Sequence, residues 1–303
     1  MAITIYNIKK WYKMLSGKSV LHVNQDIGKH FSKCQVKGYY NNMKEKVLFA
    51  KHLVESPDLP LLNTESGGTF YFPVAIFQFA FGLLDLYYET NEEKYIAKFR
   101  QCADWALNCQ LENGAWDNFS YIYKEYPFGS MAQGEGASLM VRAYVQYKDS
   151  KYLEAAKKAI SFMLKDVKEG GCTRYENNNI VLLEYQHLPV VLNGWIFSWW
   201  GLYDYFLVTK DSEIKKIMDQ CLQTLVKYLP CFSNGFWSMY DTNGKIASPF
   251  YHNLHIAQMQ AMYALTKIQD FDFYAKKWEN EQSNYLFKMI AFAKKSYQKI
   301  IEK

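Results

Sequence analysis

Residues 193–229 read NGWIFSWWGLYDYFLVTKDSEIKKIMDQCLQTLVKYL, and this stretch decides the fold. Its first part, residues 193–205, is apolar on almost every side, whereas residues 213–229 carry lysines on alternating turns. The polar segment between them, residues 209–212, suits the N-cap of a new helix. A helix that is apolar all round is buried, and a helix with one charged face is partly solvated. The stretch therefore predicts a hairpin of one buried and one solvated helix.

The same pattern recurs along the chain at a nearly constant spacing. Apolar helices are predicted to begin near residues 73, 131, 191 and 251, at steps of 58, 60 and 60 residues. A period of this size indicates a repeated supersecondary unit. Repeated hairpins with buried helices inside and solvated helices outside form an α/α toroid. We therefore expect an all-α fold, an incomplete α/α barrel of helical hairpins over residues 61–303.

Two segments depart from the repeat. Residues 1–60 are predicted as an irregular lead-in that wraps the toroid, with one helix from about Lys44 to Val54, in a chain that forms a single domain. In residues 175–185, three asparagines (177–179) separate two extended runs. This pattern predicts a small inserted β-hairpin at the mouth of the ring, and little other strand is expected.

The composition limits the class of protein. Half of the 303 residues are apolar, which predicts a large core, and 17% are aromatic, which suits a groove where sugar rings stack. A formal charge of +5 suits an anionic substrate but is too small to predict nucleic-acid binding. No apolar run is long enough to predict a transmembrane segment, and no secretory signal pattern is seen, so a cytoplasmic location is expected.

Metal and cofactor chemistry is not expected from the pattern of ligand residues. His252 and His255 are three residues apart and can share a helix face, but no carboxylate stands beside them at ligand spacing. We therefore predict no metal site.

The residues that could carry chemistry gather at the predicted starts of the buried helices. They are Tyr71, Gln78, Gln133, Glu135, Glu184, Tyr185, Asn193, Tyr240, Tyr251, His252 and His255. Convergent polar groups in a concave aromatic site are typical of an active site. A structural interpretation stays open for several of them. Glu184 can pair with Arg174 across the β-hairpin, and His255 can be a core histidine.

Five segments in register with the repeat resemble the C-terminal domain of D-glucuronyl C5-epimerase, the enzyme that makes iduronic acid in heparan sulfate precursors. They are GTFYFP (68–73) with Gln78, SMAQG (130–134), Glu184-Tyr185 followed by LNG (192–194), GLYD (201–204), and Tyr251-His252 with His255, Ile256 and Gln258. The resemblance covers about residues 66–280. It implies an α/α toroid, and it implies an isomerase that needs no cofactor and converts D-glucuronosyl to L-iduronosyl units.

The resemblance also implies roles for individual residues. Tyr185 and Tyr251 would transfer protons on opposite faces of the sugar, with Tyr240 lining the site and Glu184 completing the catalytic set. The substrate-binding residues would be Tyr71, Gln78, Gln133, Glu135, Arg174, Asn193, His252 and His255. The expected partner is an anionic glucuronate-containing polysaccharide, such as heparosan, or a lipid-linked glycan, and a homodimer is a further expectation.

The pKa of tyrosine and two positions that differ from the family pattern bear on these implied roles. A tyrosine with a pKa of about 10 needs nearby cations or donors to act as a base, and His252, His255 and Arg174 are candidates. Lys245 follows Tyr240 where the family has an arginine a few residues on, and Glu135 stands where the animal sequences have glutamine.

Three alternatives to an epimerase remain open. The first is a polysaccharide lyase, and the second is a glycoside hydrolase using Glu135 and Glu184. The third is a glycan-binding protein without activity.

Overall fold

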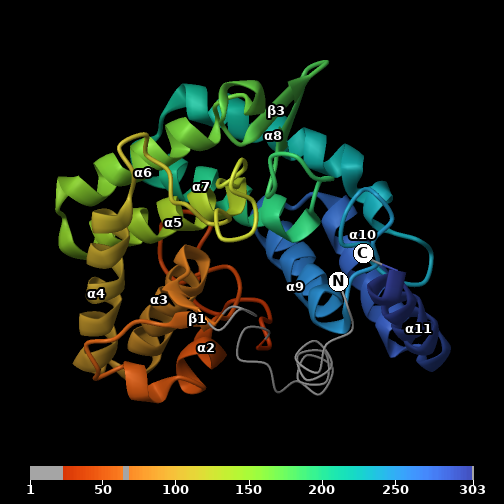
Figure 1. The fold of residues 1–303 in the computed structure, drawn as a ribbon, viewed down its shortest axis with the longest axis horizontal. Helices are drawn as coiled ribbons and strands as arrows, with labels where there is room; N and C mark the ends of the chain where they lie inside the picture. Colours follow the sequence, from red (N-terminus) through yellow and green to blue (C-terminus); the bar gives the residue numbers. More distant parts are fainter. Residues whose placement is uncertain (1–22, 64–67, 302–303) are drawn as a thin grey trace.

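The computed structural model of the chain describes residues 23–63 and 68–301, and it shows an incomplete α/α toroid (Figure 1). Four inner helices lie within an arc of four outer helices. The inner helices are α3 (Pro73–Thr90), α5 (Ser130–Tyr147), α7 (Leu192–Thr209) and α9 (Pro249–Thr266), and the outer helices are α4 (Glu93–Cys109), α6 (Ser150–Met163), α8 (Ser212–Tyr228) and α10 (Gln269–Ser283). The all-α fold of repeated helical hairpins is confirmed, and each inner helix begins within two residues of its predicted start.

The polar elbows, the segments between the two helices of each hairpin, provide a side-chain cap for α6 and α8, whereas α4 and α10 begin without one. The Asp149 side chain accepts a hydrogen bond from the backbone N–H of Lys151 at the start of α6. The Asp211 side chain does the same for Glu213 and Ile214 at the start of α8. Each cap satisfies backbone donors that the first turn of a helix leaves unpaired.

The inner helices α5 and α7 approach each other so closely that glycine is required where they cross. A Cβ atom added at Gly201 would lie 2.5 Å from the carbonyl oxygen of Gly134. Glycine lacks that atom and so lets the two backbones touch. This contact sets the spacing of the inner ring around the larger of two hydrophobic clusters, and a smaller cluster forms around Trp237.

The inserted β-hairpin is confirmed, two residues earlier than predicted at its start. It consists of β3 (Thr173–Glu176) and β4 (Asn179–Leu182), which pair antiparallel. Its turn residues Asn177 and Asn178 have φ angles of 46° and 62°, the left-handed region that asparagine tolerates better than most residues. A second, unexpected pair joins β1 (Leu61–Asn63) to β2 (Thr69–Tyr71).

The prediction of a single helix from Lys44 to Val54 is wrong. Helix α2 (Lys44–Leu48) ends after five residues, and a separate 3₁₀ turn follows (Lys51–Leu53). Leu48 and Phe49 are exposed, so packing does not hold a longer helix, and short helices are marginal on their own hydrogen bonds. Residues 1–22 of the predicted lead-in lie outside the described residues.

The described part of the lead-in reaches the middle of the toroid. The Tyr39 ring stacks on Phe81 of α3 with 3.8 Å between ring centroids. The Tyr40 hydroxyl donates to Asp204 of α7 over 2.6 Å, and Asp204 also pairs with Arg142 of α5 over 2.5 Å. This buried ion pair with its extra hydrogen bonds ties the lead-in to two inner helices.

Candidate active site

The four predicted catalytic residues come together, although up to 67 positions separate them in sequence. Glu184 and Tyr185 follow β4, Tyr240 lies in the loop after α8, and Tyr251 is in the first turn of α9. The side chain of Tyr185 lies close enough to those of Glu184 and Tyr240 to interact with them, and Tyr240 lies equally close to Tyr251. The rings of Tyr240 and Tyr251 meet edge to face at 4.8 Å. We call these four residues the acid–tyrosine series.

A cavity of about 480 Å³ lies beside this series. Its lining includes Tyr123, Tyr185, Tyr240, Asp241 and Lys245. The Lys245 amino group lies 6.0 Å from the centre of the Tyr240 ring, within range of a cation–π contact. The cavity therefore combines phenol groups with a positive charge.

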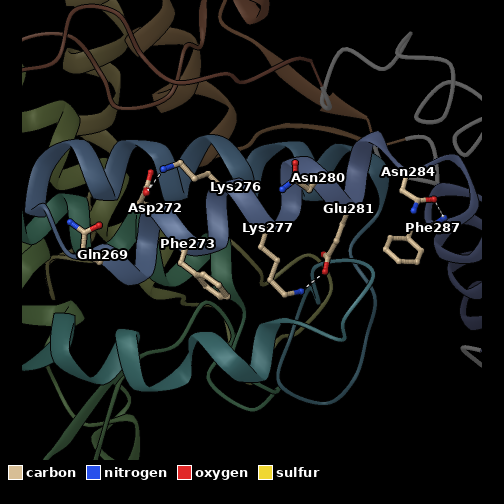
Figure 2. A pocket seen from close by; sticks show the side chains of 9 residues that line it. All are labelled: Gln269, Asp272, Phe273, Lys276, Lys277, Asn280, Glu281, Asn284 and Phe287. Carbon is tan, nitrogen blue, oxygen red and sulfur yellow. Dashed lines mark hydrogen bonds and ion pairs between the residues drawn. The ribbon is translucent and has the colours of Figure 1, made fainter.

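A larger cavity, of about 820 Å³, lies along α10 and the start of α11 (Tyr285–Ile301) (Figure 2). Two ion pairs border it, Lys276 with Asp272 and Lys277 with the buried Glu281, and the ring of Phe273 faces it. None of the site residues predicted from the sequence is among the described residues that line this larger cavity. We therefore place the candidate site at the smaller cavity.

The tyrosines of the series are held as neutral phenols. Burial raises the pKa of Tyr185, Tyr240 and Tyr251 above the usual value, and the neighbouring Glu184 raises it further. Burial also raises the pKa of Glu184 to about 8, against a hydrogen bond from Tyr185 that lowers it. The site therefore favours uncharged forms of all four groups near neutral pH.

The histidines do not supply the positive charge that phenolate formation was expected to use. Nδ1 of His252 and Nδ1 of His255 both contact the Ser238 hydroxyl, at 2.8 and 2.9 Å. His252 also contacts the Trp278 carbonyl through Nε2 at 3.2 Å and stacks on Trp237. Burial lowers the pKa of His252 to about 3 and that of His255 well below normal. Both rings are therefore neutral, and the expectation that they act as cations is wrong.

Two buried carboxyl groups stand inside the ring. Glu135 of α5 accepts a hydrogen bond of 2.9 Å from Gln78 of α3, and burial raises its pKa to about 8. Glu184 leans against the start of α7, where a Cβ at Gly194 would collide with its carboxylate. One oxygen of each carboxyl group, together with the side-chain oxygen of Asn193, is buried without a hydrogen bond. Burying an acceptor oxygen without a hydrogen bond costs free energy. These three oxygens are therefore suited to accept hydrogen bonds from polar groups that enter the region.

The sequence model of the D-glucuronyl C5-epimerase C-terminus family matches residues 124–280, just over half of the chain. This span contains the whole acid–tyrosine series. The chain belongs to the D-glucuronyl C5-epimerase C-terminus family. A curated relative from Caenorhabditis elegans, called D-glucuronyl C5-epimerase, is 26% identical over 62% of this chain and 35% of its own length. An uncharacterized protein of Methanocaldococcus jannaschii is 29% identical over 50% of this chain and 51% of its own.

Both relatives are longer than the region that matches this chain. The matched region is 35% of the Caenorhabditis elegans protein and 51% of the Methanocaldococcus jannaschii protein. Among solved structures, an endo-β-1,4-glucanase from Acetobacter xylinum matches with a TM-score of 0.46 at 13% identity, over 71% of this chain and 70% of that one. A polysaccharide lyase matches with a TM-score of 0.44 at 13% identity, over 91% and 71%. At these values the two structures do not bear on function.

Three residues that the family resemblance assigns to substrate binding have other contacts. The Gln133 amide accepts from the backbone of Trp116 and donates back to it, at 2.8 and 3.0 Å, and so holds a loop. Arg174 pairs with Glu176 within β3, so the pairing with Glu184 considered from the sequence does not form. Tyr71 is exposed and packs edge-on against Trp105.

Sequence reasoning missed part of the wall around Tyr185. Phe119 stacks on the Tyr185 ring at 4.5 Å, and Tyr123 meets it edge-on at 6.1 Å and lines the cavity. Both lie in the loop between α4 and α5, within the aromatic stretch DNFSYIYKEYPF at residues 117–128. That aromatic density was the available signal.

In the described parts of this family member, no three His, Cys, Asp or Glu side chains are grouped as a metal site.

Proposed function

We propose that the protein is a uronosyl C5-epimerase that converts D-glucuronosyl to L-iduronosyl units within an anionic polysaccharide such as heparosan. Membership of the epimerase family supports this reaction class. The acid–tyrosine series beside a cavity lined by Lys245 is the observation that carries the proposal. Inverting carbon 5 requires a group that takes a proton and a group that returns one, and the series holds several proton-transfer groups in contact.

Glu184 gives Tyr185 a way to act as a base without a stable phenolate. In the proposed step the C5–H bond breaks, its electron pair moves into the substrate carboxylate as an enediolate, and the proton passes to the Tyr185 oxygen. The phenol proton of Tyr185 passes at the same time to ionised Glu184. Because burial disfavours a phenolate at Tyr185, this relay leaves the negative charge on the substrate rather than on the tyrosine.

The opposite face of the enediolate then takes a proton from Tyr251. The cycle leaves Glu184 protonated and Tyr251 as a phenolate, which its burial disfavours, so a proton is drawn back to Tyr251. After the product departs, the contacts from Tyr185 through Tyr240 to Tyr251 return the proton along the series. Lys245, which lines the cavity, stabilises the doubly charged enediolate, as preorganised cations do for charge that develops in a transition state.

The deciding experiment follows hydrogen exchange at carbon 5. Heparosan is incubated with the protein in deuterated water, and NMR measures deuterium at that carbon together with new iduronosyl signals. Tyr185→Phe and Tyr251→Phe are each expected to slow exchange by about 10²- to 10⁴-fold. Tyr205→Phe is the matched control, because Tyr205 is also buried but lies on α7 near the elbow, among Asp211 and Glu154.

Each outcome separates one class of function from another. Exchange at full rate in both site variants would refute the proposed roles of the tyrosines. Unsaturated uronate detected by its absorbance, without iduronosyl signals, would identify a lyase. Heparosan binding with no exchange in the wild type would identify a glycan-binding protein.

A further inference from the structure

Helix α11 follows the last hairpin of the toroid and lies at the edge of the molecule (Figure 1). Ala291 is its one fully buried side chain in the described range. The same side of the helix is attached to the loop before α9, where Gln298 accepts from the backbone N–H of Ile246 over 2.9 Å and Lys295 donates to its carbonyl over 2.7 Å. One face of α11 therefore docks on the protein.

The opposite face of α11 is apolar and exposed. Leu286 is 69% exposed and Tyr285 is 73% exposed, and the same face carries Met289, Ile290, Tyr297 and Ile300. At 3.6 residues per turn these six side chains occupy an arc of about 140°, with Ala291 on the other side of the axis. An exposed apolar stripe of this width on one helix marks an interaction surface.

Lysines border this stripe. Lys288 and Lys294 are exposed and lie on its two flanks, and residues 285–301 contain four lysines and no aspartate or glutamate. A helix with an apolar face, lysines beside it and aromatic side chains is suited to lie in the plane of a membrane interface, where the lysines meet anionic headgroups. We propose that α11 binds the surface of an anionic lipid bilayer, with its apolar stripe in the headgroup layer.

The charge of α11 favours a lipid surface over a second copy of this chain. Two α11 stripes packed against each other would bring the lysine flanks together without any acidic residue of either helix to offset them. Like charges placed together weaken an interface. The helix lies on the membrane rather than across it, since no helix in the described residues has the length and apolarity needed to span one.

The position of α11 gives this surface a consequence for the candidate site. Gln298 and Ile301 of α11 line the same cavity as Tyr185 and Tyr240. Attachment through α11 therefore brings the cavity close to the lipid surface. The proposal does not depend on the proposed reaction, because it rests on the outer face of α11 alone.

The test is co-sedimentation of the full chain with vesicles. Vesicles of phosphatidylcholine containing phosphatidylglycerol are expected to bind the protein, and vesicles of phosphatidylcholine alone are expected to bind it much less. Leu286→Ser combined with Ile290→Ser should weaken binding by about 100-fold, because two large apolar side chains no longer leave water. Lys288→Glu combined with Lys294→Glu should weaken it by about 25-fold or more and reduce its dependence on salt.

Lys157→Glu is the matched charge control, since Lys157 is exposed on the outer helix α6 and should not alter binding. Circular dichroism and urea unfolding confirm that each variant folds. Equal binding to neutral and anionic vesicles, or no binding, would overturn the proposal. Light scattering completes the test, because a dimer that Leu286→Ser with Ile290→Ser dissociates, without vesicle binding, would assign the stripe to a second copy instead.

Discussion

The two ends of the four inner helices are built differently. At the elbow end, each helix stops in the same way, at Asn91, Lys148, Lys210 and Lys267, with φ between 56° and 62°. Each of these residues donates its backbone N–H to the carbonyl four positions earlier. Three of them are lysines whose amino groups lie over the aromatic ring of that same earlier residue.

At the mouth end, the starts of these helices do not share one pattern. Among the four starts, only Ser248 provides a side-chain cap; prolines open α3 and α9, while Gly129 precedes α5. The segment that enters α7 supplies Glu184 and Tyr185, and the first turn of α9 supplies Tyr251. The repeated end therefore sets the fold, and the end that varies from repeat to repeat carries the groups suited to chemistry. Changes at the mouth should alter activity, and changes at the elbow should alter stability alone.

The largest expected effect is on the carbon-5 exchange rate, when Glu184 at the mouth is replaced. If Glu184 accepts the proton of Tyr185, it must be ionised, and its pKa is raised to about 8. The wild-type exchange rate should therefore rise with pH through about 8. Glu184→Gln keeps the shape of the side chain but should lower the rate by about 10²- to 10⁴-fold and remove that rise. Exchange rates measured from about pH 6 to 9 decide the matter, and an unchanged pH profile in the variant would exclude the relay.

The next effect is on the pH dependence of the free energy of unfolding, when Glu135 near the mouth is replaced. Its folded pKa is raised to about 8 from a normal value of 4.5, so between these values the folded state binds more protons than the unfolded state. The free energy of unfolding therefore falls as pH rises through this window, by at most about 1.4 kcal/mol per pH unit for this group. Glu135→Gln should remove that loss. Urea unfolding at about pH 5 and 7 should show the variant gaining on the wild type as pH rises.

The comparison between pH 5 and 7 also avoids the titration of a second buried group. The pKa of Lys46 is lowered to about 8 by burial, so it contributes mainly above this window. An equal pH dependence in the two proteins would show that Glu135 is solvated in solution and has an ordinary pKa.

The sequence predicted what local patterns encode. The period of the hairpins, the caps at Asp149 and Asp211 and the asparagine turn of the β-hairpin all depend on residues that are close together in the chain. The grouping of the tyrosines depends on contacts across three repeats, so it came from resemblance to a family rather than from the residues themselves.

The errors have the same physical origin. The neutral state of His252 depends on its burial between Trp237 and Trp278, which spacing along the chain does not reveal. The contact of Phe119 with Tyr185 joins two loops of irregular length. The left-handed lysines at the elbows were also missed, because glycine or asparagine is the usual residue in that conformation.

A moderate effect tests the elbow at Asp211, which caps α8. Asp211→Ala removes the acceptor for the N–H groups of Glu213 and Ile214 and should lower the free energy of unfolding by about 1 kcal/mol. Asp211→Asn is the matched control, since asparagine caps about as well. Chemical denaturation measures the loss, and the carbon-5 exchange rate should be the same in all three proteins. A change in that rate would mean that the elbow is coupled to the mouth.

The smallest effect compares two replacements of Lys210, which ends α7 with φ of 56° and places its amino group 5.3 Å from the Phe206 ring centre. Both Lys210→Ala and Lys210→Gly lose this cation–π contact, which contributes about 0.5 to 1 kcal/mol at an exposed site. Only glycine adopts a left-handed conformation without steric cost. Lys210→Gly should therefore be more stable than Lys210→Ala by about 1 kcal/mol in urea unfolding. If alanine proved equal or better, the uniform elbow geometry would not be a source of strain, and the lysines would be retained there for their contact with the aromatic ring alone.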